Sequence, residues 1–321
     1  MPQSFHPPVL PLPLSNGSII TVGSFDGVHL GHQAVLREIG RRARAAGRVS
    51  LLVTFEPHPL EVVNPEAAPP LLTTGPERLE ILAQSPLDYV VLLRFDRHVA
   101  ELTPEQFVRQ ILVERCAVRE LVIGHDHGFG RGRSGDVETL RLLGAAIGFA
   151  VDVVDAVAVR GQLVSSSRIR RAVAGGDLVT AAAMLGRPYG VVGQVGRGEQ
   201  RGRVLGVPTI NLTQLSPRKL LPPDGIYAVV VEWRGGRAGG MMHQGPRPTF
   251  QDGRRVLEAH LFDFEGDLYG EWVRIEWVER LRDVETFSSV EELQAQMTQD
   301  RTAALAALGR SRPPMTGVLH A

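Results

Sequence analysis

The sequence is poor in several residue types, and each shortage excludes a class of protein. The one cysteine, Cys116, excludes an internal disulfide. Lys219 is the only lysine, so a Schiff-base enzyme or a phosphate loop ending in Gly-Lys-Ser/Thr has no suitable residue. Aromatic residues make up 6% of the chain, and its 35 basic residues equal its 35 acidic ones. A nucleic-acid partner is therefore disfavoured, because no basic surplus and few stacking aromatics are present.

Long hydrophobic stretches are lacking as well. No run of about 18 apolar residues is present to span a membrane. The proline-rich lead-in, residues 1–17, lacks the basic start and the unbroken apolar segment of a signal peptide. We therefore expect a cytoplasmic protein with small-molecule partners and with no nucleic acid and no membrane partner. These features leave the oligomeric state open.

The composition that remains is that of a folded globular protein. Hydrophobic residues make up 43% and charged residues 22% of the 321-residue chain. At about 150 residues per domain, this length favours two domains.

Apolar runs alternate with helical patterns in the first half, over residues 18–185. The apolar runs are IITVG, VSLLVTF, YVVLLRF and ELVIG, and the helical patterns include HQAVLREIGRRARAAG and PERLEILAQ. This alternation predicts a doubly wound α/β domain with a parallel sheet covered by helices. Thr103-Pro104-Glu105-Gln106 predicts a capped helix start within it.

The second half, residues 186–310, changes to glycine-rich turns and short β-branched segments. These segments are YGVVGQVG, GIYAVVVEW, LEAHLFDF and EWVRIEWV, and they predict a small antiparallel β-barrel. A cap at Ser288 or Ser289, followed by apolar residues at helical spacing, predicts a closing helix. We expect residues 311–321 to form a tail.

The stretch GSFDGVHLGH, residues 23–32, lies where the first strand should turn into a helix. In a doubly wound domain this turn is the usual phosphate site, because the helix start offers N–H groups and a partial positive charge. His29 and His32 are three residues apart, so they should share a helix face and donate toward the same phosphates. A capped helix start with two surface histidines is the simpler alternative. A zinc site that also uses His125 and His127 is disfavoured, because cysteine ligands are absent.

Four ordered motifs in this half resemble the prokaryotic bifunctional riboflavin kinase/FMN adenylyltransferases, also called FAD synthetases. The motifs are GSFDGVHLGH at 23–32, VTFEPHP at 53–59, GHDHGFGRGRSGD at 124–136 and VSSSRIR at 164–170. The resemblance covers nearly the whole chain after the lead-in. It implies a nucleotidyltransferase-type, Rossmann-like domain that adenylylates FMN with release of pyrophosphate. His29 and His32 would hold the ATP triphosphate, and Arg170 would close on it from the other side.

The resemblance also implies further binding residues. Those on ATP in this domain are Gly23, Phe25, Asp26, His29, His32, Ser166 and Arg170. Those on the flavin are Asp126, Phe129 and Arg247. From the residues alone, VSSSRIR is more typical of a serine-capped helix with solvated arginines. An ordinary turn explains the Asp126 loop nearly as well as a binding loop does. The FMN phosphate is already an anionic nucleophile, so catalysis requires mainly alignment and neutralisation of charge by histidine, arginine and Mg²⁺.

The second half matches, in order, the kinase half of the same family. Its motifs are GQVGRGEQRGRVLGVPTINL at 193–212, PPDGIYAVVV, HQGPRPTF and VLEAHLFDFEGDLYG. Glycines such as Gly198 and Gly202 allow a backbone cradle over the ATP phosphates. The resemblance gives Thr209 and Asn211 the role of binding Mg²⁺, with Thr209 also on ATP. By itself, PTIN is more typical of a turn and a strand start.

Glu258 lies in LEAHLFDF, where alternation places Glu258, His260 and Phe262 on one face of a strand. The resemblance implies that Glu258 is the base for the ribityl hydroxyl of riboflavin. The alternative from the residues alone is a solvated surface carboxylate.

Two departures from the family pattern concern the flavin. The chain has His243-Gln244-Gly245 where the family usually reads Asn-Ile-Gly, and His127 where it usually has phenylalanine. We expect both to affect flavin affinity and loop geometry, because an apolar wall has become polar. The predicted function is phosphorylation of riboflavin to FMN and adenylylation of FMN to FAD, with ATP as co-substrate. The alternative is an adenylyltransferase whose barrel only binds flavin as a sensor.

Overall fold

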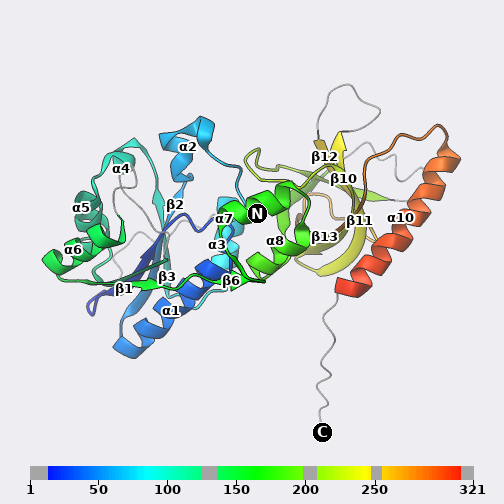
Figure 1. Ribbon diagram of the computed structural model, residues 1–321. Coiled ribbons are helices and arrows are strands. Elements are labelled where there is room, and N and C mark those ends of the chain that lie inside the picture. The colour runs from blue at the N-terminus through cyan, green and yellow to red at the C-terminus, as the bar shows by residue number, and fades with distance from the viewer. Residues whose placement is uncertain (1–13, 125–135, 198–207, 247–254, 312–321) are drawn as a thin grey trace, which may run out of the picture. The chain divides into compact units, whose positions relative to one another are not determined.

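The computed structural model describes residues 14–124, 136–197, 208–246 and 255–311. The chain forms two compact units, Met1–Ser166 and Ser167–Ala321 (Figure 1). None of the helices within the described ranges combines the length and the apolar character needed to cross a membrane.

The first unit is built on a five-stranded parallel sheet with the strand order β3-β2-β1-β4-β5. The strands are β1 (Ser18–Val22), β2 (Val49–Glu56), β3 (Tyr89–Arg94), β4 (Val118–Gly124) and β5 (Ala150–Val154). All five residues of β1 are buried, as expected for a central strand covered on both faces. The predicted doubly wound α/β fold is confirmed.

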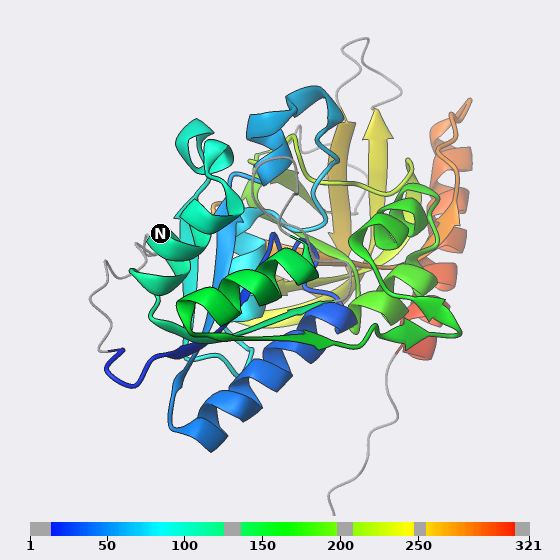
Figure 2. The same cartoon turned by 60° about the vertical axis from the view of Figure 1, so that its left-hand side comes forward.

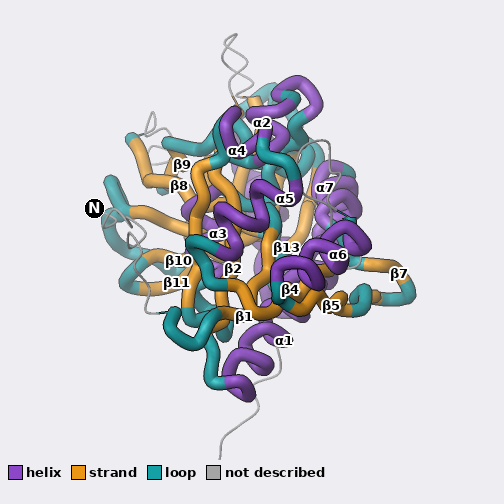
Figure 3. The backbone as a smooth tube through the Cα atoms, turned by 90° about the vertical axis from the view of Figure 1, so that its left-hand side faces the viewer, coloured by secondary structure: helices purple, strands orange, loops and turns teal. Residues whose placement is uncertain are grey.

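Helices cover both faces of this sheet, with α5 and α6 on one side and α1 on the other (Figure 3). The helices are α1 (Leu30–Ala46), α2 (Pro59–Val63), α3 (Gly75–Leu82), α4 (Arg97–Glu101), α5 (Pro104–Phe107) and α6 (Val137–Ile147). A 3₁₀ turn covers Pro65–Ala67, and a short hairpin is formed by β6 (Ala158–Val159) and β7 (Gln162–Leu163).

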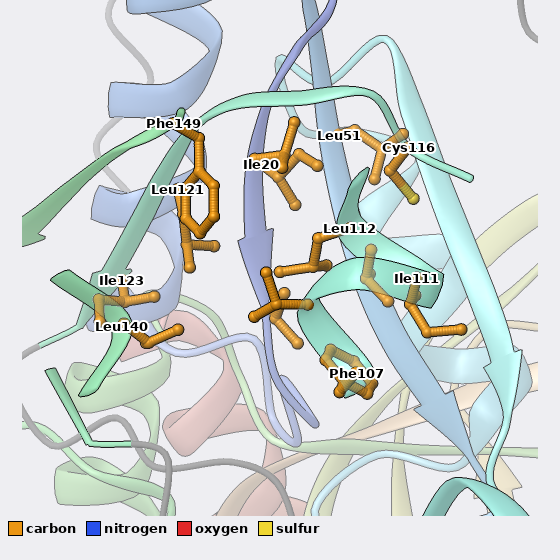
Figure 4. Close-up of a cluster of buried hydrophobic side chains, with 14 of the residues drawn as sticks. Ile20, Leu51, Phe107, Ile111, Leu112, Cys116, Leu121, Ile123, Leu140 and Phe149 are labelled. Atoms are coloured by element: carbon orange, nitrogen blue, oxygen red, sulfur yellow. The ribbon is translucent and has the colours of Figure 1, made fainter. Parts of the chain in front are cut away.

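The helical segment that starts at Thr103 covers one face. Thr103 and Gln106 form the predicted capping box, with N···O distances of 3.2 and 2.9 Å. After α5 the chain continues as a π-helix over Val108–Val113. Phe107, Ile111 and Leu112 pack with residues of β1, β2 and β4, together with the buried Cys116 (Figure 4).

The second unit is a closed barrel with the strand order β10-β11-β12-β9-β8-β13, and every pairing in it is antiparallel. Its strands are β8 (Gly190–Gly196), β9 (Thr209–Thr213), β10 (Gly225–Trp233), β11 (Gly236–Pro246), β12 (Arg255–Leu261) and β13 (Trp272–Arg282). On β10, Tyr227, Val229 and Val231 are fully buried along one face of the strand, and Ala228 on the other face is buried in a cluster with residues of the helix that follows the barrel. The predicted β-barrel is confirmed.

Helices precede and follow the barrel. Before it come α7 (Ser166–Ala174), which spans the division between the units, and α8 (Leu178–Leu185). After it, α10 (Val290–Ser311) runs along the outside of the barrel (Figure 2). Ala304 and Ala307 of α10 pack on Ala228 and Met241. The Ser289 hydroxyl accepts a hydrogen bond from the Glu292 N–H at 3.2 Å, which confirms the predicted cap of this closing helix.

Candidate active sites

The first candidate site follows β1, at the point where the strand order of the sheet reverses. β1 pairs with β2 on one side and with β4 on the other, so the loops after β1 and β4 leave the same edge. This edge is where doubly wound sheets bind their ligands. The loop after β1 is residues 23–29 of GSFDGVHLGH, and the loop after β4 begins at His125, outside the described residues.

The backbone of the loop after β1 is strained at two non-glycine residues. Phe25 and Val28 have φ angles of 50° and 37°, and Gly27 between them has a φ of 84°. The left-handed region is unfavourable for a β-branched residue such as valine, so surrounding contacts must hold this conformation. One contact is the Val28 N–H bond to the Phe25 carbonyl at 3.0 Å, and another is the Gln33 side-chain N–H bond to the Val28 carbonyl at 3.0 Å.

Asp26 anchors this loop to residues 72–73. Its carboxylate accepts hydrogen bonds from the backbone N–H groups of Leu72 at 3.0 Å and Thr73 at 2.8 Å, and from the Thr73 hydroxyl at 3.0 Å. The same hydroxyl accepts from the Gly27 N–H at 2.9 Å. Because Asp26 is 1% exposed and already has these three donors, its visible role is to set the loop conformation. Its predicted contact with ATP stays a prediction.

His29 is itself the N-cap of α1. Its Nδ1 accepts a hydrogen bond from the His32 backbone N–H at 3.2 Å. The two imidazole rings stack with centroids 3.6 Å apart, and the Phe25 ring lies 4.4 Å from that of His32. A Cβ atom on Gly31 would lie 3.2 Å from the His29 ring, so glycine leaves room for this stack. Since Nδ1 accepts, the proton of a neutral His29 ring is on Nε2, which can donate to a phosphate oxygen.

The VSSSRIR motif contacts the same loop through Ser166. The Ser166 hydroxyl donates to the Asp26 backbone carbonyl at 2.9 Å. Arg170 lies one turn further along α7 and is half-buried.

The other predicted residues of this site are less informative. Gly23 donates its N–H to the Val53 carbonyl at 3.1 Å, which ties the start of the loop after β1 to β2. The predicted flavin residues Asp126 and Phe129, and the departure at His127, lie outside the described residues.

A buried arginine that the sequence did not predict supports the loop after β1. Arg78 of α3 is 1% exposed and donates to the carbonyls of Ser24 at 3.1 Å and Phe55 at 2.7 Å. It also bonds the Glu56 carboxylate at 2.8 Å. Burial raises the pKa of Glu56, and the charge of Arg78 opposes that rise. The only sequence signal for this group was Glu56 within VTFEPHP.

The second candidate site is a row of polar side chains across three barrel strands. Glu258 of β12 is directly opposite Asn211 of β9 on one side and His243 of β11 on the other. The Thr209 hydroxyl donates to Glu258 Oε1 at 2.6 Å. Leu257, Ala259 and Leu261 are buried while Glu258 and His260 are only half-buried, which confirms the predicted alternation of this strand.

A pocket adjoins this row and includes Thr209 and Asn211 in its wall. Its lining comes from β8, β9, the end of β12 and the turn after it: Val195, Pro208, Thr209, Ile210, Asn211, Leu261, Phe264, Gly266, Asp267, Leu268 and Tyr269. A ring nitrogen of His260 lies 2.8 Å from the Pro208 carbonyl and fixes the start of β9 beside it. Gly198, Gly202 and Arg247, which were predicted for this site, lie outside the described residues.

The departure at Gln244 lies inside the barrel, away from this polar row. Gln244 is fully buried opposite Leu257, and its amide N–H groups donate to the carbonyls of Pro222 at 2.6 Å and Pro223 at 3.1 Å. Its amide oxygen accepts from the Trp277 indole N–H at 3.1 Å. The buried amide is therefore compensated by hydrogen bonds, and it ties the turn before β10 to β13.

Among the described residues, no group of three or more histidine, cysteine or acidic side chains could hold a metal ion. The donor set offered by Thr209 and Asn211 is instead a hydroxyl and a carboxamide oxygen. Such hard oxygen ligands suit Mg²⁺, which takes its remaining ligands from substrate phosphates and water.

Comparison with known proteins covers both halves. A family model described as FAD synthetase matches residues 13–168, and one described as riboflavin kinase matches residues 185–308. Proteins named bifunctional riboflavin kinase/FMN adenylyltransferase are 36% identical in Escherichia coli K12 and 38% identical in Pseudomonas fluorescens. Each of these alignments covers 92% of this chain, with 95% and 94% of the respective relative. The Bacillus subtilis protein of that name is 33% identical over 90% of this chain and 92% of its own length.

A similar solved structure comes from Streptococcus pneumoniae. It is described as a macrolide-efflux protein, and it superposes with a TM-score of 0.81 at 31% identity. The match covers 90% of this chain and 94% of that one, so both units of the fold have counterparts in it.

Proposed function

Since this chain belongs to the family of bifunctional riboflavin kinase/FMN adenylyltransferases, we propose how its own residues divide the two reactions between the two halves of the chain. The chain transfers a phosphoryl group from ATP to riboflavin, which gives FMN. It then transfers an adenylyl group from a second ATP to FMN, which gives FAD and pyrophosphate.

We place the adenylyltransferase domain at residues 18–185 and the kinase domain at residues 186–310. The lead-in is then 1–17 and the tail 311–321. The family matches that end at 168 and begin at 185 support a boundary in this region, as does the start of β8 at Gly190. We further propose a cytoplasmic location and no nucleic-acid partner, in keeping with a single buried cysteine and a balanced charge.

In the adenylyltransferase domain, the loop after β1 and the start of α1 would bind the ATP phosphates. An oxygen of the FMN phosphate attacks the α-phosphorus, and pyrophosphate leaves. His29 carries this proposal, because its capping bond through Nδ1 directs the Nε2 proton to the outside of the cap. His32 stacks on it and adds a second ring at the same helix start, and Arg170 keeps its predicted role on the triphosphate. These groups neutralise charge that develops on the phosphates, and no covalent intermediate is required.

In the kinase domain, Glu258 would accept the proton of the ribityl hydroxyl as its oxygen attacks the γ-phosphorus. The Thr209 hydroxyl orients one carboxylate oxygen by donating to it at 2.6 Å. Thr209 and Asn211 would hold Mg²⁺, which when bound neutralises the phosphate oxygens. The adjoining pocket, with apolar walls such as Leu261, Phe264 and Leu268, would receive the adenosine part of ATP.

The single observation that carries the kinase proposal is the bond of Thr209 to Glu258 beside Asn211. It brings all three residues assigned to phosphoryl transfer into one place, from two separate strands. A barrel that only bound flavin as a sensor would not require this arrangement.

A reciprocal pair of variants tests the division of labour. Glu258→Gln should lower the kcat of FMN formation by about 10² to 10⁴, because glutamine cannot accept the proton, while supplied FMN still becomes FAD.

The reciprocal variant combines His29→Asn with His32→Asn. It should abolish FAD formation and leave FMN formation intact, since asparagine preserves the helix cap but removes the imidazole donors. Chromatography of FMN and FAD measures the rates of both reactions. Near-normal FMN formation by Glu258→Gln, or loss of both activities in a folded histidine variant, would refute the corresponding assignment.

A further inference from the structure

His243 is directly opposite Glu258 on the neighbouring strand, on the same face of the barrel wall. Side chains directly opposite each other on antiparallel strands have Cβ atoms about 4.5 to 5.5 Å apart. The register of β11 thus places an imidazole beside the carboxylate that we propose as the base. The other neighbours of His243 in this row are apolar Ile226 on β10 and, beyond it, Arg282 on β13.

The environment of the ring fixes its chemical character. His243 forms a hydrogen bond with the backbone of Pro246, which can only accept because proline has no N–H. The Nε2 atom is buried and has no hydrogen-bond partner among the described residues, so the proton is on Nδ1. Burial lowers the pKa of His243 and outweighs the opposite effects of the Glu258 and Asp224 charges. The ring is therefore neutral at pH 7, and Nε2 is a buried acceptor.

Two hydrogen-bond acceptors thus lie side by side, and neither can satisfy the other. Glu258 acts as an acceptor, as its bond from the Thr209 hydroxyl shows, and so does Nε2 of a neutral His243 whose proton is on Nδ1. Nε2 of His243, and Glu258 beyond the bond that it already accepts from Thr209, can therefore bind a ligand that presents hydroxyl donors at neighbouring positions. A polyol chain does this, since it carries one hydroxyl on each of several consecutive carbons.

We propose that His243 is a specificity-determining residue of the kinase step, whose Nε2 accepts a hydrogen bond from the 4′-hydroxyl of the ribityl chain while Glu258 binds the reacting 5′-hydroxyl. This inference rests on the proposed role of Glu258. It assigns a function to a position at which the chain departs from the pattern of the family it resembles. The kinase then selects its substrate by the positions of the ribityl hydroxyls as well as by the flavin ring.

The test compares riboflavin with 4′-deoxyriboflavin in the full chain, following phosphorylation by chromatography. With the unmodified protein, kcat/KM for the deoxy substrate should be about tenfold lower, since it leaves a buried acceptor unpaired. His243→Phe fills similar space without an acceptor, so its kcat/KM on riboflavin should fall about tenfold, mainly through KM, and its preference between the two substrates should vanish. His243→Gln places an amide oxygen near the position of Nε2 and should keep the preference.

Controls separate the possible failures. His98→Asn changes an exposed histidine on α4 in the other unit and should match the unmodified protein. Glu258→Gln is measured alongside: if it remains active, the assignment of the base is wrong. If Glu258→Gln is inactive but the unmodified protein uses both substrates equally well, the inference on His243 alone is overturned. Retention of the preference by His243→Phe would overturn it too.

Discussion

Asp26 shows how one side chain holds the conformation of the whole loop after β1. Its carboxylate is the acceptor for two buried backbone N–H groups, of Leu72 and Thr73, and through Thr73 it also fixes Gly27. The strained residues Phe25 and Val28 lie on either side of this anchor. The loop therefore has its shape before any substrate binds, which would lower the ordering cost of the triphosphate binding that we propose for it.

We expect Asp26→Ala to lower the free energy of unfolding of the first unit by about 3 kcal/mol, because two buried N–H groups lose their acceptor at about 1 to 3 kcal/mol each. FAD formation should fall sharply, and FMN formation should not. Urea unfolding and the two product assays measure this. Asp96→Ala is the matched control: Asp96 is an exposed cap that accepts from the Val99 N–H, and its loss should cost about 1 kcal/mol. Equal effects of the two changes would contradict the special role of Asp26.

At this scale the sequence predicted the helix start and the pair His29 and His32, because both follow from local spacing. It could not predict that His29 would itself cap α1, since a serine, threonine or aspartate is the usual cap. Nor could it predict the support from Thr73 and Arg78, whose loop contacts span 46 and 54 residues of chain. Such contacts depend on how α3 packs, which no local pattern encodes.

In addition to its apolar packing, α1 is linked to its sheet by the ion pairs of one arginine. Arg42 bonds Glu38 on α1 at 2.6 Å, Asp152 on β5 at 2.5 Å, and Glu120 on β4. Hydrogen bonds from Arg41 and Arg42 lower the pKa of Glu38 to about 2. This cluster ties α1, which starts at the proposed phosphate site, to β4 and β5.

The low pKa of Glu38 makes part of the stability dependent on pH. A carboxylate with a pKa of about 2 in the folded protein and about 4.3 in the unfolded chain stabilises the fold above pH 4.3, and this contribution is lost as the pH falls toward 2. Glu38→Gln should therefore be less stable than the unmodified protein at pH 7, and the difference should shrink as the pH falls from 4.3 toward 2. Thermal unfolding across this range measures it. The exposed Glu66→Gln should show no such trend, and a constant difference for Glu38→Gln would disprove the linkage.

β11 is the element that the sequence predicted least well, because contacts with residues far away in the sequence determine it. β11 reads GRAGGMMHQGP, and its glycines oppose a strand assignment. In the fold, a Cβ on Gly239 would lie 2.7 Å from Leu308 of α10, and one on Gly240 would lie 2.4 Å from the His260 carbonyl. These glycines therefore permit close approach of a helix and of a strand. The register of β11 against β12, which sets His243 beside Glu258, was likewise not readable from either strand alone.

At the scale of the whole molecule, α7 and α8 decide where the chain divides into its two units. The sequence predicted a boundary after residue 185, whereas contacts within the structure assign residues from Ser167 onward to the second unit. α8 buries Leu178, Ala181, Met184 and Leu185, so a cut within it would expose apolar surface.

Two fragments of the chain, one with α7 and all of α8 and one cut within α8, should therefore differ in thermal stability. A fragment that begins at Ser167 should be soluble and phosphorylate riboflavin at a rate close to that of the full chain, because the barrel has its own core and its closing helix. A fragment that begins at Met184 should retain the activity but unfold at a lower temperature. Melting curves and FMN formation measure both. Two insoluble fragments would show that the barrel requires the first unit to fold.

The burial of Cys116 has a practical consequence for measuring the two units separately. This thiol is fully buried in the first unit, and burial raises its pKa to about 11, so at pH 8 a thiol reagent should react only after that core opens. All three tryptophans, Trp233, Trp272 and Trp277, are in the barrel. The intact chain therefore carries an independent internal reporter in each half: a labelling rate for one and an emission spectrum for the other. Whether flavin made in the barrel changes the opening of the first unit's core can then be measured in the unmodified sequence, without an introduced cysteine or tryptophan.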